Sequence, residues 1–294
     1  MMMMRLAVAL LATGCVTEEL ATSESKIIGG TRSLGVEATV MLAGFPPSRS
    51  VLHSCTAVVV SPTVLLTAAH CVDAPNHPNY LYGVFPGDDA SPYANLAALE
   101  PELKMVASVH PHPSYSPNLP FYADIAVVVM AAPLANAPVP MQRAPLDTTV
   151  VGNAARIVGY GQTTYGQYNS TRYEAMTTVT ALDTDTVTVG DAQKRSCLGD
   201  SGGPAIVAGT LIGIDSYGPV GCDAAAHYRR VDAFMAFITP FVPVTTPDPD
   251  PDPDPDPDLD TTMDSSGCST TGGSGSRLAL LAVGLALISR RRRR

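Results

Sequence analysis

Tryptophan is absent from this 294-residue sequence, and charged residues are scarce, at 15% of the chain. The 24 glycines and 26 prolines are numerous by contrast, and this composition favours a turn-rich β protein over a helical one. Basic residues are also few: 18 lysines and arginines face 27 acidic residues. No basic face emerges, so we expect no nucleic-acid partner.

Long apolar runs and metal-ligand motifs are missing as well. No apolar run has the length that a full membrane span needs. An acidic pair, Asp88 and Asp89, is too small a group to indicate a metal site. We therefore expect neither a metal nor another cofactor.

Hydrophobic residues make up 46% of the chain, enough for one large domain or two small ones. The segment 231–242 has the apolar periodicity of a helix, which Pro240 would end or kink. Elsewhere between residues 27 and 243, short apolar runs alternate with turn-forming residues, which predicts closely spaced strands at 56–60, 64–69, 125–130, 155–160, 176–181 and 205–214. The pattern indicates an all-β domain that closes with a helix.

The six cysteines fall into two groups. Two stand alone near the ends of the chain, Cys15 and Cys268. An even number within one domain indicates two disulfides and an oxidising compartment, and four lie inside the apolar segment: Cys55, Cys71, Cys197 and Cys222.

The first 14 residues have the pattern of a signal peptide. Arg5 supplies a positive charge, and the apolar run 6–12 is too short to span a membrane. Small residues precede Cys15, which resembles the lipobox of bacterial lipoproteins, in which the cysteine is acylated. The alternative is an ordinary signal peptide with a spare cysteine. The polar residues 15–26 form a short propeptide in either case.

A linker at residues 244–277 follows the apolar segment. Its six Pro-Asp repeats, 247–258, favour a stiff polyproline-II spacer, because proline fixes an extended backbone and the aspartates repel one another. The alternative for these aspartates is calcium binding, but the row lacks the turn and the converging oxygens of a dedicated site.

The last segment, 278–294, is an apolar run followed by a cluster of arginines. With the Gly-Cys motif at Cys268, it resembles the three-part C-terminal sorting signals of myxobacterial surface proteins. A plain tail anchor is the alternative. We therefore expect an exported protein that its terminal anchors hold at the membrane of the outer cell surface. The alternative is a secreted protein.

The motif CLGDSGGP at residues 197–204 carries chemistry. Ser201 lies between glycines on a tight turn, where its hydroxyl can stand exposed. The same turn can direct the backbone N–H groups of Gly199 and Ser201 at one point, which is what the oxyanion of acyl transfer requires. Glycine at position 199 permits that backbone conformation.

Two more motifs supply the partners of this serine. LLTAAHC, residues 65–71, places His70 at the end of an apolar strand, and histidine is the base that a serine hydroxyl needs near neutral pH. YADIAVV, residues 122–128, places Asp124 just before another strand, where its carboxylate can fix the tautomer of the histidine.

With these motifs in the order His, Asp, Ser, the chain resembles the chymotrypsin family of serine proteases over residues 27–243. The resemblance implies two packed six-stranded β-barrels with the catalytic triad at their junction. It also implies the disulfides Cys55–Cys71 and Cys197–Cys222. Protein or peptide substrates follow from it. The rival interpretations are a binding module without activity on the same fold and a surface-anchored adhesion protein.

Residues 26–30, KIIGG, resemble the activation site of that family. Cleavage after Lys26 would free the ammonium group of Ile27. In the family this group pairs with the aspartate before the nucleophile, here Asp200, and the ion pair orders the oxyanion loop. The alternative is that the segment is only a strand followed by a turn.

Residues 216–218, Ser216-Tyr217-Gly218, resemble the edge strand that pairs with the substrate backbone. The family's position for P1 selection holds Arg195, and Ala226 would narrow the pocket. This combination predicts an acidic or small P1 residue.

The alternative is that Arg195 turns outward or pairs with a local carboxylate such as Asp215 or Asp223, leaving a small neutral pocket. Under either interpretation the enzyme would not cut after Lys26. We therefore expect a separate trypsin-like protease to activate it.

Overall fold

The computed structural model describes residues 27–242 except 36, 51, 74–76, 78, 119–120 and 162–169. The expected signal peptide, propeptide, linker and sorting tail lie outside the described residues, as do Cys15, Lys26 and Cys268. Within the described part of the chain, no helix is long and apolar enough to cross a membrane.

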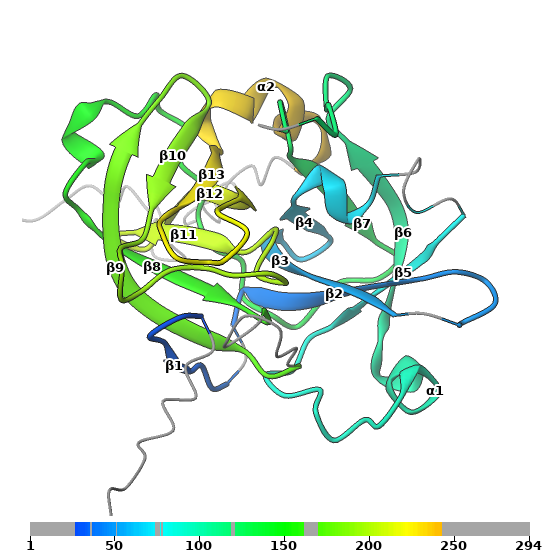
Figure 1. Ribbon diagram of the computed structural model, residues 1–294. Helices are drawn as coiled ribbons and strands as arrows, with labels where there is room; N and C mark the ends of the chain where they lie inside the picture. Colours follow the sequence, from blue (N-terminus) through cyan, green and yellow to red (C-terminus); the bar gives the residue numbers. More distant parts are fainter. Residues whose placement is uncertain are drawn as a thin grey trace, which may run out of the picture. The chain divides into compact units, whose positions relative to one another are not determined.

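The first half of the domain is a closed antiparallel barrel in the order β2-β3-β4-β7-β6-β5 (Figure 1). Valine, leucine and alanine side chains from these strands fill its interior, because β-branched and aliphatic residues pack well on a pleated surface. The strands are β2 (Thr39–Phe45), β3 (His53–Ser61), β4 (Val64–Thr67), β5 (Leu81–Phe85), β6 (Lys104–Pro111) and β7 (Ala126–Met130).

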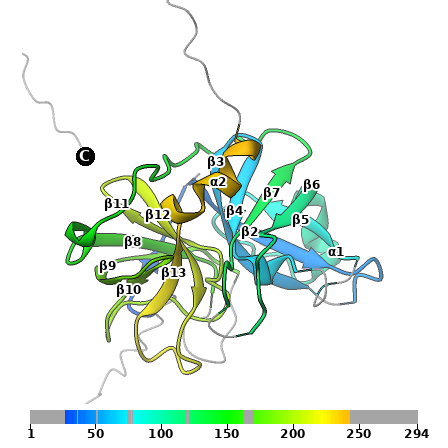
Figure 2. The same cartoon turned by 90° about the horizontal axis from the view of Figure 1, so that it is seen from above.

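The second half is a barrel of six further strands, which the pairing of β8 with β9 closes. A short strand, β1 (Thr31–Arg32), adds to β9 from outside. The barrel strands are β8 (Ala154–Gly159), β9 (Tyr173–Leu182), β10 (Thr186–Val189), β11 (Pro204–Val207), β12 (Thr210–Tyr217) and β13 (Ala226–Arg230). The two barrels lie side by side in both views (Figure 2). The predicted all-β fold of two six-stranded barrels is confirmed.

The closing helix packs over the junction of the barrels. It consists of a 3₁₀ turn (Asp232–Phe234), α2 (Met235–Ile238) and a second 3₁₀ turn (Thr239–Phe241). The regular α-helix is thus shorter than the predicted 231–242, and Pro240 lies in the final turn. The apolar cluster beneath it combines residues of both barrels with the helix: Val58, Leu66, Ile125, Leu211, Ile214, Phe234 and Ile238.

The remaining helical segments are short. α1 (Leu96–Leu99) begins at Asn95, whose side-chain oxygen accepts the N–H of Ala98 at 3.0 Å and so caps the helix. The other turns are 3₁₀ segments at Ala69–Cys71, Glu100–Glu102 and Thr148–Val150.

Arg172, just before β9, is fully buried and reaches out of the second barrel. Its guanidinium donates to the carbonyl oxygens of Thr39 in β2, at 3.0 Å, and Gly35, at 2.6 Å. The backbone of Ser33 donates to the Arg172 carbonyl at 3.0 Å. The Arg172 side chain therefore links the second barrel to the chain segment that enters the first barrel, because it donates hydrogen bonds to the carbonyl oxygens of that segment.

We predict that Arg172→Met lowers the free energy of unfolding by about 2–4 kcal/mol, since it leaves buried carbonyls without a donor. Urea unfolding of the substituted and parent proteins measures this. Arg143→Met is the matched control, because Arg143 is exposed. Equal losses for the two variants would contradict a linking role for Arg172.

Candidate active site

The carboxylate of Asp124 is completely buried at the barrel junction. Its Oδ2 lies 2.8 Å from Nδ1 of His70, and its Oδ1 accepts the backbone N–H of the same histidine at 2.9 Å. The hydroxyl of Ser216, on β12 of the other barrel, donates to Oδ2 at 2.7 Å. These bonds fix the imidazole ring and place its Nε2 edge toward the cavity.

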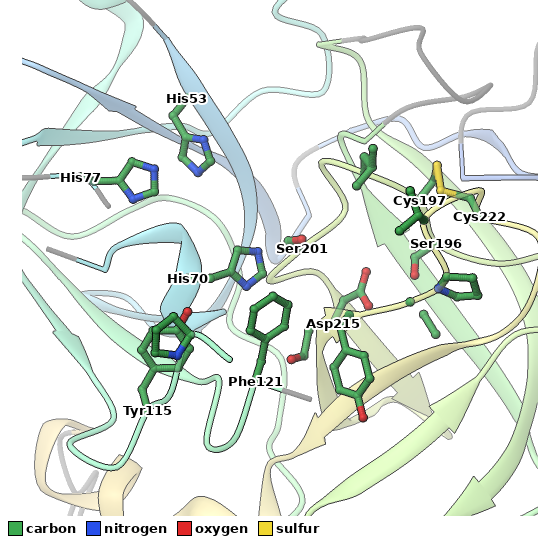
Figure 3. Close-up of a pocket in the computed structure, with 18 residues that line it drawn as sticks. His53, His70, His77, Tyr115, Phe121, Ser196, Cys197, Ser201, Asp215 and Cys222 are labelled. Carbon is green, nitrogen blue, oxygen red and sulfur yellow. A yellow bond between two sulfur atoms is a disulfide. The ribbon is translucent and has the colours of Figure 1, made fainter. Parts of the chain in front are cut away.

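Ser201 lies on the turn that precedes β11, across from His70. The two side chains face each other at the mouth of one pocket, which both of them line (Figure 3). The carbonyl oxygen of Ser201 accepts the N–H of Thr56, in β3, at 2.9 Å. The structure therefore brings together the three residues that the sequence motifs singled out.

Gly199 shapes the backbone two residues before Ser201. Its φ is +95°, which favours glycine, and a Cβ there would lie 2.8 Å from the Cα of Gly161. Its carbonyl turns away from the pocket and accepts the Thr56 hydroxyl at 3.1 Å. Within the described residues, the N–H groups of Gly199 and Ser201 have no protein acceptor, so both are available to an oxyanion.

The two disulfides have the pairing that the family resemblance implied. Cys55–Cys71 joins β3 to the turn that carries His70, and Cys197–Cys222 joins the serine loop to the segment before β13. Cys197 and Cys222 line the pocket. The first disulfide thus ties the turn of His70 to β3, and the second ties the loop of Ser201 to the pocket wall.

Asp200 is buried beside the nucleophile and has no basic partner among the described residues. Burial raises its pKa to about 7, although the N–H groups of Cys197, at 2.9 Å, and Gly161, at 2.8 Å, donate to its oxygens. A Cβ on Gly159 would lie 2.1 Å from Oδ1, so the carboxyl sits in a tight backbone cradle.

Ile27 is also buried, with its side chain in the core of the second barrel. The next residue, Ile28, accepts the N–H of Arg195 at 3.2 Å and forms a bridge with it. The segment that follows Lys26 thus packs against the loop that leads to the serine.

The pocket beside the serine has a volume of ≈ 580 Å³. Four residues that we predicted for it do line it: Ser216, Tyr217, Gly218 and Ala226. Within the part of the chain that the structure describes, most of the other lining residues are apolar or aromatic.

The hypothesis that the Arg195 guanidinium lies at the pocket base is wrong. Its side chain donates to the backbone carbonyls of Cys222 and Ala192, and at 3.4 Å to that of Asp191. A guanidinium needs several acceptors, and these backbone carbonyls supply them. Arg195 itself is not among the residues that line the pocket.

Asp215, which sequence reasoning treated only as a partner for Arg195, lines the pocket instead. It is 5% exposed, and burial raises its pKa well above the ordinary value; the charge of Asp200 adds to this effect, while the Ser196 hydroxyl and the Ser216 N–H oppose it. The position of this acidic residue, at the end of the apolar run of β12 and directly before Ser216, is the sequence signal that could have predicted its place in the pocket.

Aromatic side chains around His70 were also missed. Phe121 stacks against the His70 ring with centroids 5.7 Å apart. On the other side, His53 and His77 line the pocket with ring centroids 4.4 Å apart (Figure 3). Burial lowers the pKa of His53 to about 4, so this ring is neutral near pH 7.

Comparison with known proteins agrees with the geometry. The family model described as trypsin matches residues 27–238. A trypsin of Phaedon cochleariae is 28% identical over 213 residues, which are 63% of this chain and 78% of that protein. Glucanase inhibitor protein 1 of Phytophthora sojae is 28% identical and covers 80% of this chain and 96% of its own.

Among solved structures, neuropsin, a serine protease expressed in the limbic system of mouse brain, is 25% identical, with a TM-score of 0.57. It covers 72% of this chain and 97% of its own. The match over residues 27–238, together with the two six-stranded barrels, shows that this chain belongs to the trypsin family.

Proposed function

We propose that this chain is an exported serine endopeptidase, made as a zymogen that cleavage after Lys26 activates. One observation carries the proposal: the His70–Asp124 pair faces Ser201 beside two backbone N–H groups that have no protein acceptor among the described residues. The proposed base and nucleophile thus border one cavity, and the proposed oxyanion donors belong to the same turn as the nucleophile.

The hydroxyl oxygen of Ser201 attacks the scissile carbonyl carbon while Nε2 of His70 takes the hydroxyl proton. The carbonyl oxygen becomes an oxyanion, which the N–H groups of Gly199 and Ser201 bind. The imidazolium, stabilised by Asp124, gives its proton to the leaving amine as the C–N bond breaks. Water then attacks the acyl-enzyme in the same way and releases the carboxylic acid.

The end of β12 supports a peptide substrate. Tyr217 and Gly218 lie at the pocket edge, where an extended substrate chain can add to the strand through its main chain. The ring of Tyr217 packs on His227 with centroids 4.6 Å apart, which holds it as a wall.

The zymogen proposal rests on Asp200. A buried carboxyl without a cation is costly, and the free ammonium group of Ile27 would supply one. The burial of Ile27 and the bridge from Ile28 to Arg195 support this placement. Cleavage after Lys26 requires a protease that accepts lysine at P1, so a trypsin-like activator is a partner.

A binding module without activity is the second candidate, because one relative carries the name of an inhibitor. Family membership alone does not separate the two candidates. The intact contacts between His70 and Asp124 favour catalysis.

We also propose export to an oxidising compartment, which the two disulfides support. The terminal segments would anchor the protein at the outer cell surface, through Cys15 or through the tail that carries Cys268.

We predict that Ser201→Ala abolishes labelling by a fluorophosphonate, because the probe reacts with an activated serine hydroxyl. Asp124→Asn should lower kcat by about 10⁴-fold, the magnitude known for this type of triad, because it disturbs the histidine tautomer. Hydrolysis of an activated ester by the mature chain measures the loss. Absence of labelling in correctly cleaved parent protein would favour the binding module.

A second prediction concerns pH and the Lys26 cut. In the uncut chain Asp200 keeps its proton up to about pH 7, whereas in the unfolded chain it ionises near pH 4. The folded state therefore binds more protons between these values, and the free energy of unfolding falls as pH rises. Pairing with the Ile27 ammonium would remove this fall.

Urea unfolding of cut and uncut Ser201→Ala protein at pH 5 and pH 7.5 tests the point. The stability difference in favour of the cut form should grow with pH. Asp200→Asn should abolish this increase of the stability difference with pH. Any contribution of Asp215 to the pH dependence is the same in the cut and uncut forms and therefore drops out of the difference. A difference independent of pH would argue against the ion pair.

A further inference from the structure

We propose that Asp215 selects the P1 side chain, and that this pocket takes a cationic residue, lysine or arginine. The inference rests on the proposed function, since it assigns a substrate class to the pocket beside Ser201. It also replaces the expectation of an acidic or small P1 residue, which depended on the placement of Arg195 in the pocket.

The backbone fixes the depth of Asp215 relative to the nucleophile. Its N–H donates to the carbonyl of Gly203 at 2.8 Å, and its own carbonyl accepts the N–H of Gly202 at 2.8 Å. Gly202 directly follows Ser201, so β12 and the serine turn are joined at this point. The carboxyl consequently lies on the pocket wall close to the bond that would be cleaved (Figure 3).

Among the residues whose structure is described, the Asp215 carboxyl has no cationic partner. No lysine, arginine or histidine in the described ranges forms an ion pair with Asp215, although it is 95% buried, being 5% exposed. The ionisable and polar groups that act on it are neutral or acidic: Ser196, Asp200, Asp124 and Tyr228. A cationic side chain that entered the cavity would relieve an otherwise unpaired buried carboxyl.

The pocket is narrow, and Asp215 is the acidic residue of its described lining. A Cβ on Gly218 would lie 3.3 Å from the Cβ of Ala226, so the opposite walls approach closely here. Arg195 adds no positive charge to the lining, because its side chain bonds loop carbonyls. An acidic P1 side chain would therefore meet a carboxyl without a compensating cation.

The proposal has a consequence for activation. Lys26 would be a P1 residue that the mature enzyme itself accepts, so a small amount of mature enzyme would convert the rest of the zymogen. This reverses the expectation that only a separate trypsin-like protease performs the cut.

Four peptides that differ only at P1, with Lys, Arg, Glu or Ala, test the assignment. The mature chain should be released at Ile27 from a fusion by a cysteine protease, which avoids contamination with trypsin. We expect kcat/KM for Lys or Arg to exceed that for Glu and for Ala by at least about 100-fold. A preference for Glu or Ala would overturn the proposal.

Asp215→Asn should lower the ratio of kcat/KM for Lys over Ala by at least about 30-fold. Asp223→Asn is the matched control: this exposed carboxylate lies near the pocket but outside its lining, and the ratio should stay unchanged. An unchanged ratio in Asp215→Asn, or an equal fall in both variants, would refute the role of Asp215.

Fluorophosphonate labelling separates the two levels of failure. Labelled parent enzyme without a basic P1 preference overturns the inference and leaves the proposed function standing, whereas unlabelled parent enzyme overturns both. Labelled Asp215→Asn establishes that this variant is folded. Benzamidine, an amidinium probe, should slow labelling of the parent enzyme but not of Asp215→Asn, and equal protection of both would count against the proposal.

Self-activation has its own measurement. Mature enzyme added in trace amounts to the Ser201→Ala zymogen should cut after Lys26, as mass spectrometry would record. The Asp215→Asn enzyme should cut the zymogen at least about 30-fold more slowly when the two enzymes are added at equal active-site concentrations. Labelling of a separate sample determines those concentrations. An uncut zymogen in the presence of the parent enzyme would contradict this consequence.

Discussion

The buried carboxylate of Asp124 receives hydrogen bonds from both halves of the domain. His70 belongs to the first barrel and Ser216 to the second, and both hold the same oxygen atom of Asp124. Because an unsatisfied carboxylate in this position would be costly, the two barrels have to meet in a defined alignment. The Thr56 contacts to Ser201 and Gly199 cross the same junction and complete that alignment.

Three buried aspartates form a series around this junction. Asp124 has a basic partner within the folded chain, His70, whereas Asp200 and Asp215 have no basic partner among the described residues. In our proposals, the cation for Asp200 comes from chain cleavage and the cation for Asp215 comes from the substrate. A protein with few charged residues thus places unpaired carboxyls at the positions where activation and selectivity would act.

The fold, and the meeting of His70, Asp124 and Ser201 at one site, could be anticipated from sequence because short motifs place these residues. Strand patterns and turn residues predict the barrels, and the motifs around His70, Asp124 and Ser201 place those residues at strand ends. Side-chain directions could not be anticipated in the same way. The side chain of Arg195 bonds the nearby carbonyl of Ala192 and that of Cys222, 27 residues away, and no sequence motif signals this pair of acceptors. Arg172 bonds carbonyls more than a hundred residues away.

The bridge between Ile28 and Arg195 joins two sites that sequence alone treats separately. Ser196, the next residue, lines the pocket, so the segment that pairs with Ile28 continues directly into the pocket wall. Binding equilibria that are coupled to one another are reciprocal. Under the proposed activation, any factor by which the seating of Ile27 strengthens ligand binding is also the factor by which a ligand in the pocket would strengthen the seating of Ile27.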